Sequence, residues 1–164
     1  MKTKRIALLG ISVALAMVLS FVESLIPAFV AIPGIKVGLP NIVIVFLLYS
    51  LGWQYAAAVS LVRVVLVSIL FGNVQIMLFS LAGVALRLLG MTLLKRTKLF
   101  SSVAVSVVGG VLHNIGQIAV AVLWTQTPQV VLYLPILLIT GTVAGVVIGL
   151  VAGLLTKRLE GYKF

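Results

Sequence analysis

The chain has 164 residues, of which 63% are hydrophobic and 9% are charged, and its net charge at neutral pH is +10. In a soluble domain about 25% of the residues are charged, so this composition leaves too little polar surface for a water-soluble globule. We therefore expect one integral membrane domain over residues 1–164, with the bilayer as its solvent.

The positions of the basic residues argue against nucleic acid as a partner. Nine of the twelve fall in three clusters beside apolar segments: Lys2, Lys4, Arg5; Lys95, Arg96, Lys98; and Lys157, Arg158, Lys163. Nucleic-acid binding would favour a basic stripe with interleaved aromatic residues, and the sequence has none. Such clusters are typical of the cytoplasmic flanks of membrane helices, where they also attract anionic lipid headgroups.

Apolar segments predict about six membrane helices, since a helix needs about 20 apolar residues to cross a bilayer core. They cover about 6–25, 41–51, 55–71, 76–94, 102–124 and 131–156. The first resembles a signal peptide at its basic start but has no clean small-residue cleavage site, so we expect it to be a membrane helix. The second is short and is expected to be a short or re-entrant helix.

The segment IPAFVAIPGIKVGLP precedes the short second helix and contains three prolines and two glycines. These residues interrupt helices, and the segment is long for a simple turn, so we expect a cap over the outer face.

Six spans place both termini on one side, and all three basic clusters then fall on that side. The opposite connections hold one charge, Lys36. This bias predicts that both termini are cytoplasmic.

Two arginines and the single histidine lie inside apolar spans: Arg63, Arg87 and His113. An arginine at the bilayer centre costs about 2.5–3.5 kcal/mol on insertion scales. The carboxylate near the membrane is Glu23, which can pair with Lys36 or with one arginine. At least one arginine is therefore expected to lack an anionic partner within the chain.

Two interpretations of the arginines stay open. In the first, the side chain reaches backbone carbonyls or extends along its helix to the headgroups, which we favour for Arg87. In the second, the missing anion is a ligand, because a guanidinium binds carboxylate or phosphate oxygens two at a time. We favour the second for Arg63.

The segment GGVLHNIGQI places His113 and Gln117 four residues apart, on one face of a helix. Asn114 lies about 100° round the helix from His113. The three polar side chains either bond neighbouring helices together or line a polar pocket, and we favour the pocket. One histidine without further ligands does not predict a metal site, and without a paired carboxylate or an activated nucleophile His113 does not predict an enzyme.

Small residues at every fourth position predict close helix contacts. In the first span Gly10 and Ala14 form such a pair, and so do Ser12 and Ala16. The sixth span has a longer ridge, GTVAGVVIGLVAG, with glycines at 141, 145, 149 and 153. We expect internal packing for this ridge and give equal weight to an external partner for the first span.

Six strings in this order resemble the heptaprenyl diphosphate synthase component I family, also called the Gx transporter family: ESLIP, PGIKVGLPN, SLVRVVLVSILFG, FSLAG, HNIGQ and YLPILLITG. The resemblance covers nearly the whole chain. That family is similar to the substrate-binding S-components of energy-coupling factor (ECF) transporters, which are bacterial six-helix vitamin-uptake proteins with cytoplasmic termini. The resemblance thus implies an S-component-like, all-α integral membrane protein of the bacterial inner membrane.

The resemblance also implies roles for individual residues. S-components bind substrate in their outer half, under the loop between helices one and two. The matching strings place substrate-binding roles on Glu23, Lys36, Asn41, Arg63, His113, Asn114 and Gln117. Small residues of helix one dock the transmembrane coupling subunit, which sits on two ATPase subunits, and this role falls on Gly10 and Ala14. Arg87 matches no motif of the family.

The synthase name conflicts with the composition. Prenyl diphosphate synthesis needs magnesium ions held by clustered acids, whereas this chain has no aspartate and only Glu23 and Glu160. It also lacks a GxxxxGK(S/T) phosphate loop, so any ATP hydrolysis belongs to partners. We expect no enzyme activity, metal or resident cofactor.

The leading hypothesis is uptake of a small anionic or amphipathic substrate, vitamin- or isoprenoid/quinone-related. The alternative is an accessory subunit of isoprenoid, quinone or flavin-linked electron-transfer machinery.

Overall fold

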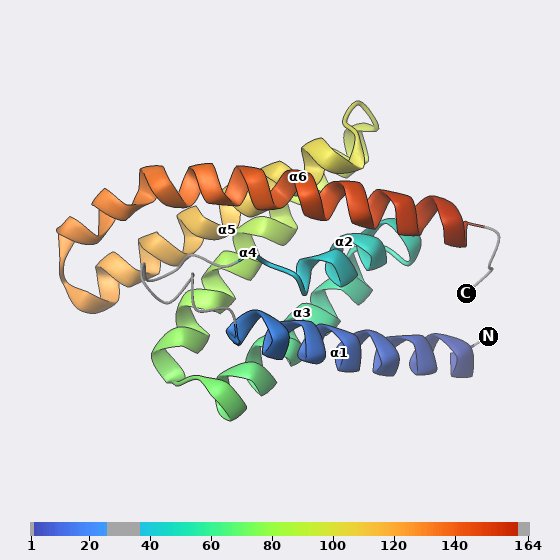
Figure 1. Cartoon of the computed structure of the whole chain (residues 1–164), viewed down its shortest axis with the longest axis horizontal. Coiled ribbons are helices and arrows are strands. Elements are labelled where there is room, and N and C mark those ends of the chain that lie inside the picture. The colour runs from blue at the N-terminus through green and yellow to red at the C-terminus, as the bar shows by residue number, and fades with distance from the viewer. Residues whose placement is uncertain (1, 26–36, 161–164) are drawn as a thin grey trace.

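The structure, a computed structural model, describes residues 2–25 and 37–160, and Figure 1 shows their arrangement. These residues form helices and no strands. The helices are α1 (Lys2–Ser24), α2 (Asn41–Ser50), α3 (Trp53–Phe71), α4 (Val74–Thr97), α5 (Ser102–Thr125), the short 3-10 helix η2 (Pro128–Tyr133) and α6 (Leu134–Leu159). The segment from 26 to 36, which contains most of the predicted cap and Lys36, lies outside the described residues.

Five helices of the described part are long and apolar enough to cross a membrane: α1, α3, α4, α5 and α6 with η2. The shortest of them, α3, has 19 residues, which at 1.5 Å per residue gives about 28 Å and matches a hydrocarbon core of about 30 Å. The prediction of an all-α membrane protein is confirmed. With 10 residues, α2 is only about 15 Å long and does not cross, which fits the expected short helix.

Local chemistry fixes several helix boundaries. The Asn73 side chain accepts a hydrogen bond from the Ile76 amide at 2.8 Å and starts α4, and Ser101 does the same for α5 through Ala104. Gly52 has a φ of +104° and turns the chain between α2 and α3. The sixth predicted span begins at 131, whereas α6 begins at Leu134, because Pro128–Tyr133 forms a 3-10 turn, a frequent prelude to a helix.

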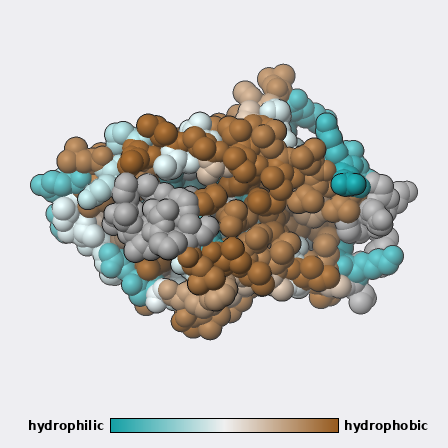
Figure 2. Space-filling view, in the orientation of Figure 1, coloured by the Kyte–Doolittle hydropathy of each residue, from teal (hydrophilic) through white to brown (hydrophobic). Residues whose placement is uncertain are grey.

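Helix α6 runs along the whole length of the molecule, and α3 and α4 lie obliquely beneath it (Figure 1). The first turn of α1 and the last turn of α6 lie at the same end (Figure 1). Figure 2 shows hydrophobic side chains across the middle of one face, with hydrophilic residues toward both ends. This pattern is that of a multi-pass membrane protein. The cytoplasmic assignment of the termini stays a prediction.

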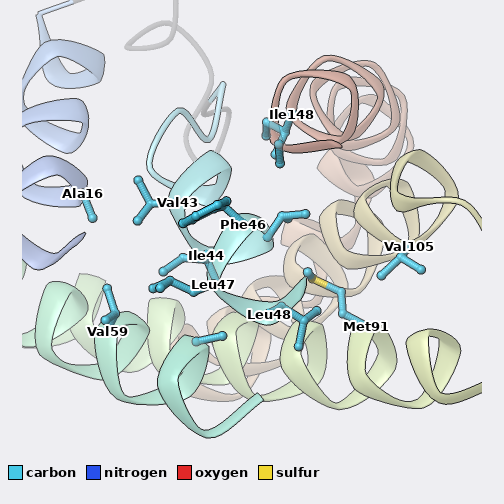
Figure 3. Packing of buried hydrophobic residues seen from close by; sticks show 13 residues of the cluster. Ala16, Val43, Ile44, Phe46, Leu47, Leu48, Val59, Met91, Val105 and Ile148 are labelled. Atoms are coloured by element: carbon cyan, nitrogen blue, oxygen red, sulfur yellow. The ribbon is translucent and has the colours of Figure 1, made fainter. Parts of the chain in front are cut away.

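Helix α2 forms the centre of the apolar core. Its residues Val43 to Leu48 are all buried, at 0–8% exposure. They pack with Ala16, Val59, Met91 and Ile148 from four other helices (Figure 3). A helix that is apolar on all sides is stable only inside a protein or a membrane. In this fold α2 is enclosed by protein. Its first residue, Asn41, lies beside a polar cavity.

Glycines bring α5 and α6 into backbone contact. A Cβ atom added at Gly145 would lie 2.6 Å from the Val107 Cα, and one at Gly149 would lie 2.6 Å from the Val103 Cα. Only glycine allows helices to approach so closely. The expected internal role of the glycine ridge in the sixth span is therefore confirmed.

Candidate functional site: a polar cavity inside the bundle

All six α-helices line one polar cavity with a volume of about 70 Å³. Among the predicted substrate-binding residues, six line this cavity: Glu23, Asn41, Arg63, His113, Asn114 and Gln117. Arg87, which was not among them, lines it as well. The seventh predicted residue, Lys36, lies outside the described residues. Side chains from positions 23 to 117 of the chain therefore meet at one place.

The Arg87 guanidinium is almost completely buried, with 2% of the residue exposed. Its Nη1 donates to the Asn41 side-chain oxygen at the start of α2, and its Nη2 donates to Ser60 Oγ on α3 at 3.3 Å. Its Nε has no hydrogen-bond partner within the described part of the chain. The interpretation favoured from sequence, a side chain that reaches headgroups or backbone carbonyls, is wrong for Arg87, because Asn41 and Ser60 hold it inside the bundle.

Arg63 supplies a second guanidinium, from α3. Its Nη1 donates to Ser20 Oγ on α1 at 3.3 Å, and its Nε also has no hydrogen-bond partner among residues 2–25 and 37–160. The hydrogen-bond acceptors of both arginines are thus neutral oxygens, on Ser20, Asn41 and Ser60. Two buried or half-buried cations consequently share one cavity, and no carboxylate of the described residues is hydrogen-bonded to either.

Glu23 is the acidic residue of the cavity. It is 8% exposed, and its Oε1 accepts a hydrogen bond of 2.6 Å from the Gly38 amide. This bond ties the end of α1 to the residues just before α2. Glu23 brings one negative charge to a cavity with two guanidiniums, so these three side chains leave a formal excess of one positive charge.

The polar residues of α5 lie where neighbouring glycines leave room for them. Asn114 is buried and donates a hydrogen bond to the Leu137 carbonyl on α6. A Cβ added at Gly141 would lie 2.6 Å from Asn114 Nδ2, and one added at Gly83 would lie 2.5 Å from His113 Nδ1. Both interpretations of this segment hold for Asn114, which bonds two helices together and also lines the cavity. His113 and Gln117 line it from the same helix.

The pair predicted to face a partner lies on the opposite side of α1 from the core. Gly10 and Ala14 are exposed, whereas Ser12 and Ala16 are buried. A Cβ at Gly10 would meet no atom of the described residues within 4 Å. The face is open to lipid or protein, and its role in docking stays a prediction.

The donor set suits an anion and does not suit a metal ion. No group of three histidine, cysteine, aspartate or glutamate residues lies together in the part of the chain that the structure describes. Guanidinium and amide N–H groups, by contrast, are the donors that bind carboxylates and phosphates.

The family model for heptaprenyl diphosphate synthase component I matches residues 12–155. The chain belongs to this family. The match includes every predicted substrate-binding residue and Arg87, and it begins after Gly10. The chain matches no curated protein and no solved structure. The family name denotes a component of a synthase. Among the described residues that line the cavity, Glu23 is the one carboxylate, whereas a magnesium site would need several.

Proposed function

We propose that this member of the heptaprenyl diphosphate synthase component I family is an S-component-like, substrate-binding membrane subunit. It would take up a small anionic or amphipathic substrate, vitamin- or isoprenoid/quinone-related, with an ECF coupling subunit and two ATPase subunits in the bacterial inner membrane. The observation that supports this most is the cavity in which the hydrogen-bond acceptors of Arg63 and Arg87, among the residues that the structure describes, are neutral oxygens.

The charge of the cavity supports an anionic substrate group. Removing a guanidinium from water costs several kcal/mol unless a counter-charge and hydrogen bonds compensate it. Glu23 offsets one of the two guanidiniums and is already bonded to Gly38. A carboxylate or phosphate of the substrate would supply the second negative charge and would accept bonds from the free Nε groups.

The volume of the cavity supports a small group. One water molecule occupies about 10–15 Å³ of such a cavity. The volume of about 70 Å³ therefore has room for roughly five to seven water-sized groups. That is the size of a carboxylate or phosphate with a few neighbouring atoms. The rest of a vitamin or an isoprenoid would extend out of the cavity.

In the proposed mechanism this chain binds the substrate and its partners hydrolyse ATP. This chain holds the substrate through its arginines and through the amide and imidazole groups of α5. Gly10 and Ala14 on the open face of α1 are available to the coupling subunit. ATP hydrolysis by the partners would drive release, because the described residues that line the cavity include no paired carboxylates for a proton relay.

Native mass spectrometry of the purified full-length protein tests the pocket. We expect a small anionic molecule to remain bound to the wild type and to be lost from Arg63→Ala and Arg87→Ala. Arg158→Ala, which removes an exposed arginine from α6 outside the cavity, should keep it. Retention of the same molecule by both cavity variants would refute the pocket.

The alternative is an accessory subunit of isoprenoid, quinone or flavin-linked machinery, which the family name favours. Vesicles separate the two functions. Accumulation of the co-purifying molecule in vesicles that contain this chain and an ECF module, but not in vesicles with the chain alone, supports uptake. No accumulation, together with co-purification of a prenyl diphosphate synthase subunit, supports the accessory role.

A further inference from the structure

An apolar groove runs along the outside of the bundle between α3 and α4 and shares no residue with the polar cavity. Its volume is about 330 Å³, and its lining includes Trp53, Ala57, Ala85, Leu89, Leu93 and Arg96. Leu89 and Leu93 are 58% and 54% exposed. The two alanines, one from each helix, leave a hollow where larger apolar side chains would fill the gap.

The groove is as long as one leaflet of a bilayer is thick. From Ala85 to Arg96 the α4 helix advances eleven residues, which at 1.5 Å per residue is about 16 Å. Half of a hydrocarbon core of about 30 Å is about 15 Å. Because Arg96 lies in the last turn of α4, the groove extends from the headgroup level to about the middle of the membrane.

The mouth of the groove carries a cation and an aromatic side chain. Arg96 is exposed, and Trp53 at the start of α3 is 49% exposed. The neighbouring Lys95 is occupied elsewhere, since its Nζ donates to the Leu48 carbonyl and lies 5.2 Å from the Tyr49 ring centroid. Arg96 is therefore the cation that faces the groove. Tryptophan favours the headgroup level of a bilayer, and a basic residue there attracts anionic lipid.

We infer that the groove between α3 and α4 binds one anionic phospholipid, with its phosphate at Arg96 and an acyl chain along α4 toward Ala85. Apolar lining, leaflet length and a cation at one end together match an acyl chain with a charged head. A protein helix in the same groove would not need the cation at its end. The inference is independent of the proposed transport function.

Native mass spectrometry of the delipidated full-length protein, titrated with phosphatidylglycerol or phosphatidylcholine of identical acyl chains, tests this site. We expect the wild type to bind one phosphatidylglycerol about fivefold more tightly than phosphatidylcholine, as one basic contact at a membrane surface provides. Arg96→Gln should abolish the preference. Arg158→Gln, in the last turn of α6 and outside both groove and cavity, should retain it. An equal loss in both variants would show diffuse charge attraction and overturn the site.

A second pair of variants tests the hollow itself. Ala85→Leu fills it and should lower binding of both lipids, whereas Ala58→Leu, on an exposed face of α3 outside the groove, should leave binding unchanged. Both are exposed alanine-to-leucine changes in helices, so helical content should stay constant. Undiminished lipid binding by Ala85→Leu would overturn the inference.

Discussion

Helix α5 faces two kinds of neighbourhood, a tight contact with α6 and the polar cavity beside it. In the contact, the glycines of α6 meet the α5 backbone so closely that a Cβ at Gly145 would lie 2.6 Å from Val107 Cα. In the cavity, glycines at 83 and 141 instead leave room for His113 and Asn114. Glycine thus allows close backbone contact in both places, and at Gly83 and Gly141 it also leaves space for polar side chains.

The α5–α6 contact and the polar cavity also differ in how they affect the stability of the bundle. Helices in a membrane gain little from the hydrophobic effect between them, so close backbone packing and interhelical hydrogen bonds hold them together. The contact of α5 with α6 is of this kind. A cavity with two guanidiniums is destabilising by itself, and we expect the glycine contact to offset it. Substitutions in the two regions should therefore act on different properties, stability in one and ligand binding in the other.

The largest effect on stability is expected for Gly145→Leu. The new side chain would collide with the α5 backbone at Val107, and we expect a cost of about 3 kcal/mol, the upper end of the usual range for overpacking. Gly10→Leu is the matched control, since a Cβ at Gly10 meets no atom of the described residues within 4 Å. Reversible unfolding in mixed micelles measures both. Equal stability of the two variants would show that the glycine contact does not hold the bundle together.

Asn41 offers a test in which stability and binding should separate. Asn41→Ala leaves Arg87 Nη1 buried without its acceptor, which should cost about 1–3 kcal/mol. Asn41→Asp keeps an acceptor and adds a negative charge beside Arg87, so the protein should stay folded with unchanged or greater stability. The same carboxylate would compete with an anionic ligand, and ligand retention in native mass spectrometry should fall. A ligand held equally by Asn41→Asp would contradict an anion at Arg87.

The smallest effect is expected at the far end of α2. Lys95 bonds the Leu48 carbonyl and lies over the Tyr49 ring, contacts that should contribute about 0.5–1 kcal/mol together. Lys95→Met should lower the unfolding free energy by that amount and leave ligand retention unchanged, because Lys95, Leu48 and Tyr49 do not line the cavity. Lys157→Met, an exposed lysine of α6, should change neither property. Loss of ligand from Lys95→Met would mean that the position of α2 controls the cavity.

Much of the fold follows from the sequence because lipid imposes strong constraints. The five long spans were predicted to within a few residues at most ends, since apolar length and terminal polar residues are readable directly. The short second span was predicted by its length, but its place in the protein core was not. Six buried residues in a row, Val43 to Leu48, are equally compatible with lipid and with a protein interior.

The sequence predicted which residue types line the cavity. It predicted less well where the Arg87 side chain points. Arginine, histidine and amides inside apolar spans are signals in themselves, and the six described candidates do line one cavity. Arg87 was expected to reach backbone carbonyls or the headgroups, because it lies a little past the middle of its span, toward the predicted cytoplasmic face. Its partners on α2 and α3, Asn41 and Ser60, lie 46 and 27 residues away in the chain, so no local pattern reveals them.

The sequence by itself determined that this chain is an all-α membrane protein with cations inside its spans, because composition and hydrophobic length report directly on the solvent that each segment requires. Only the tertiary structure decided which way the polar side chains point. Their convergence depends on how closely glycines let α4, α5 and α6 approach and on where α2 begins inside the bundle. Those distances arise from packing between segments far apart in the chain, and no periodicity within one helix encodes them.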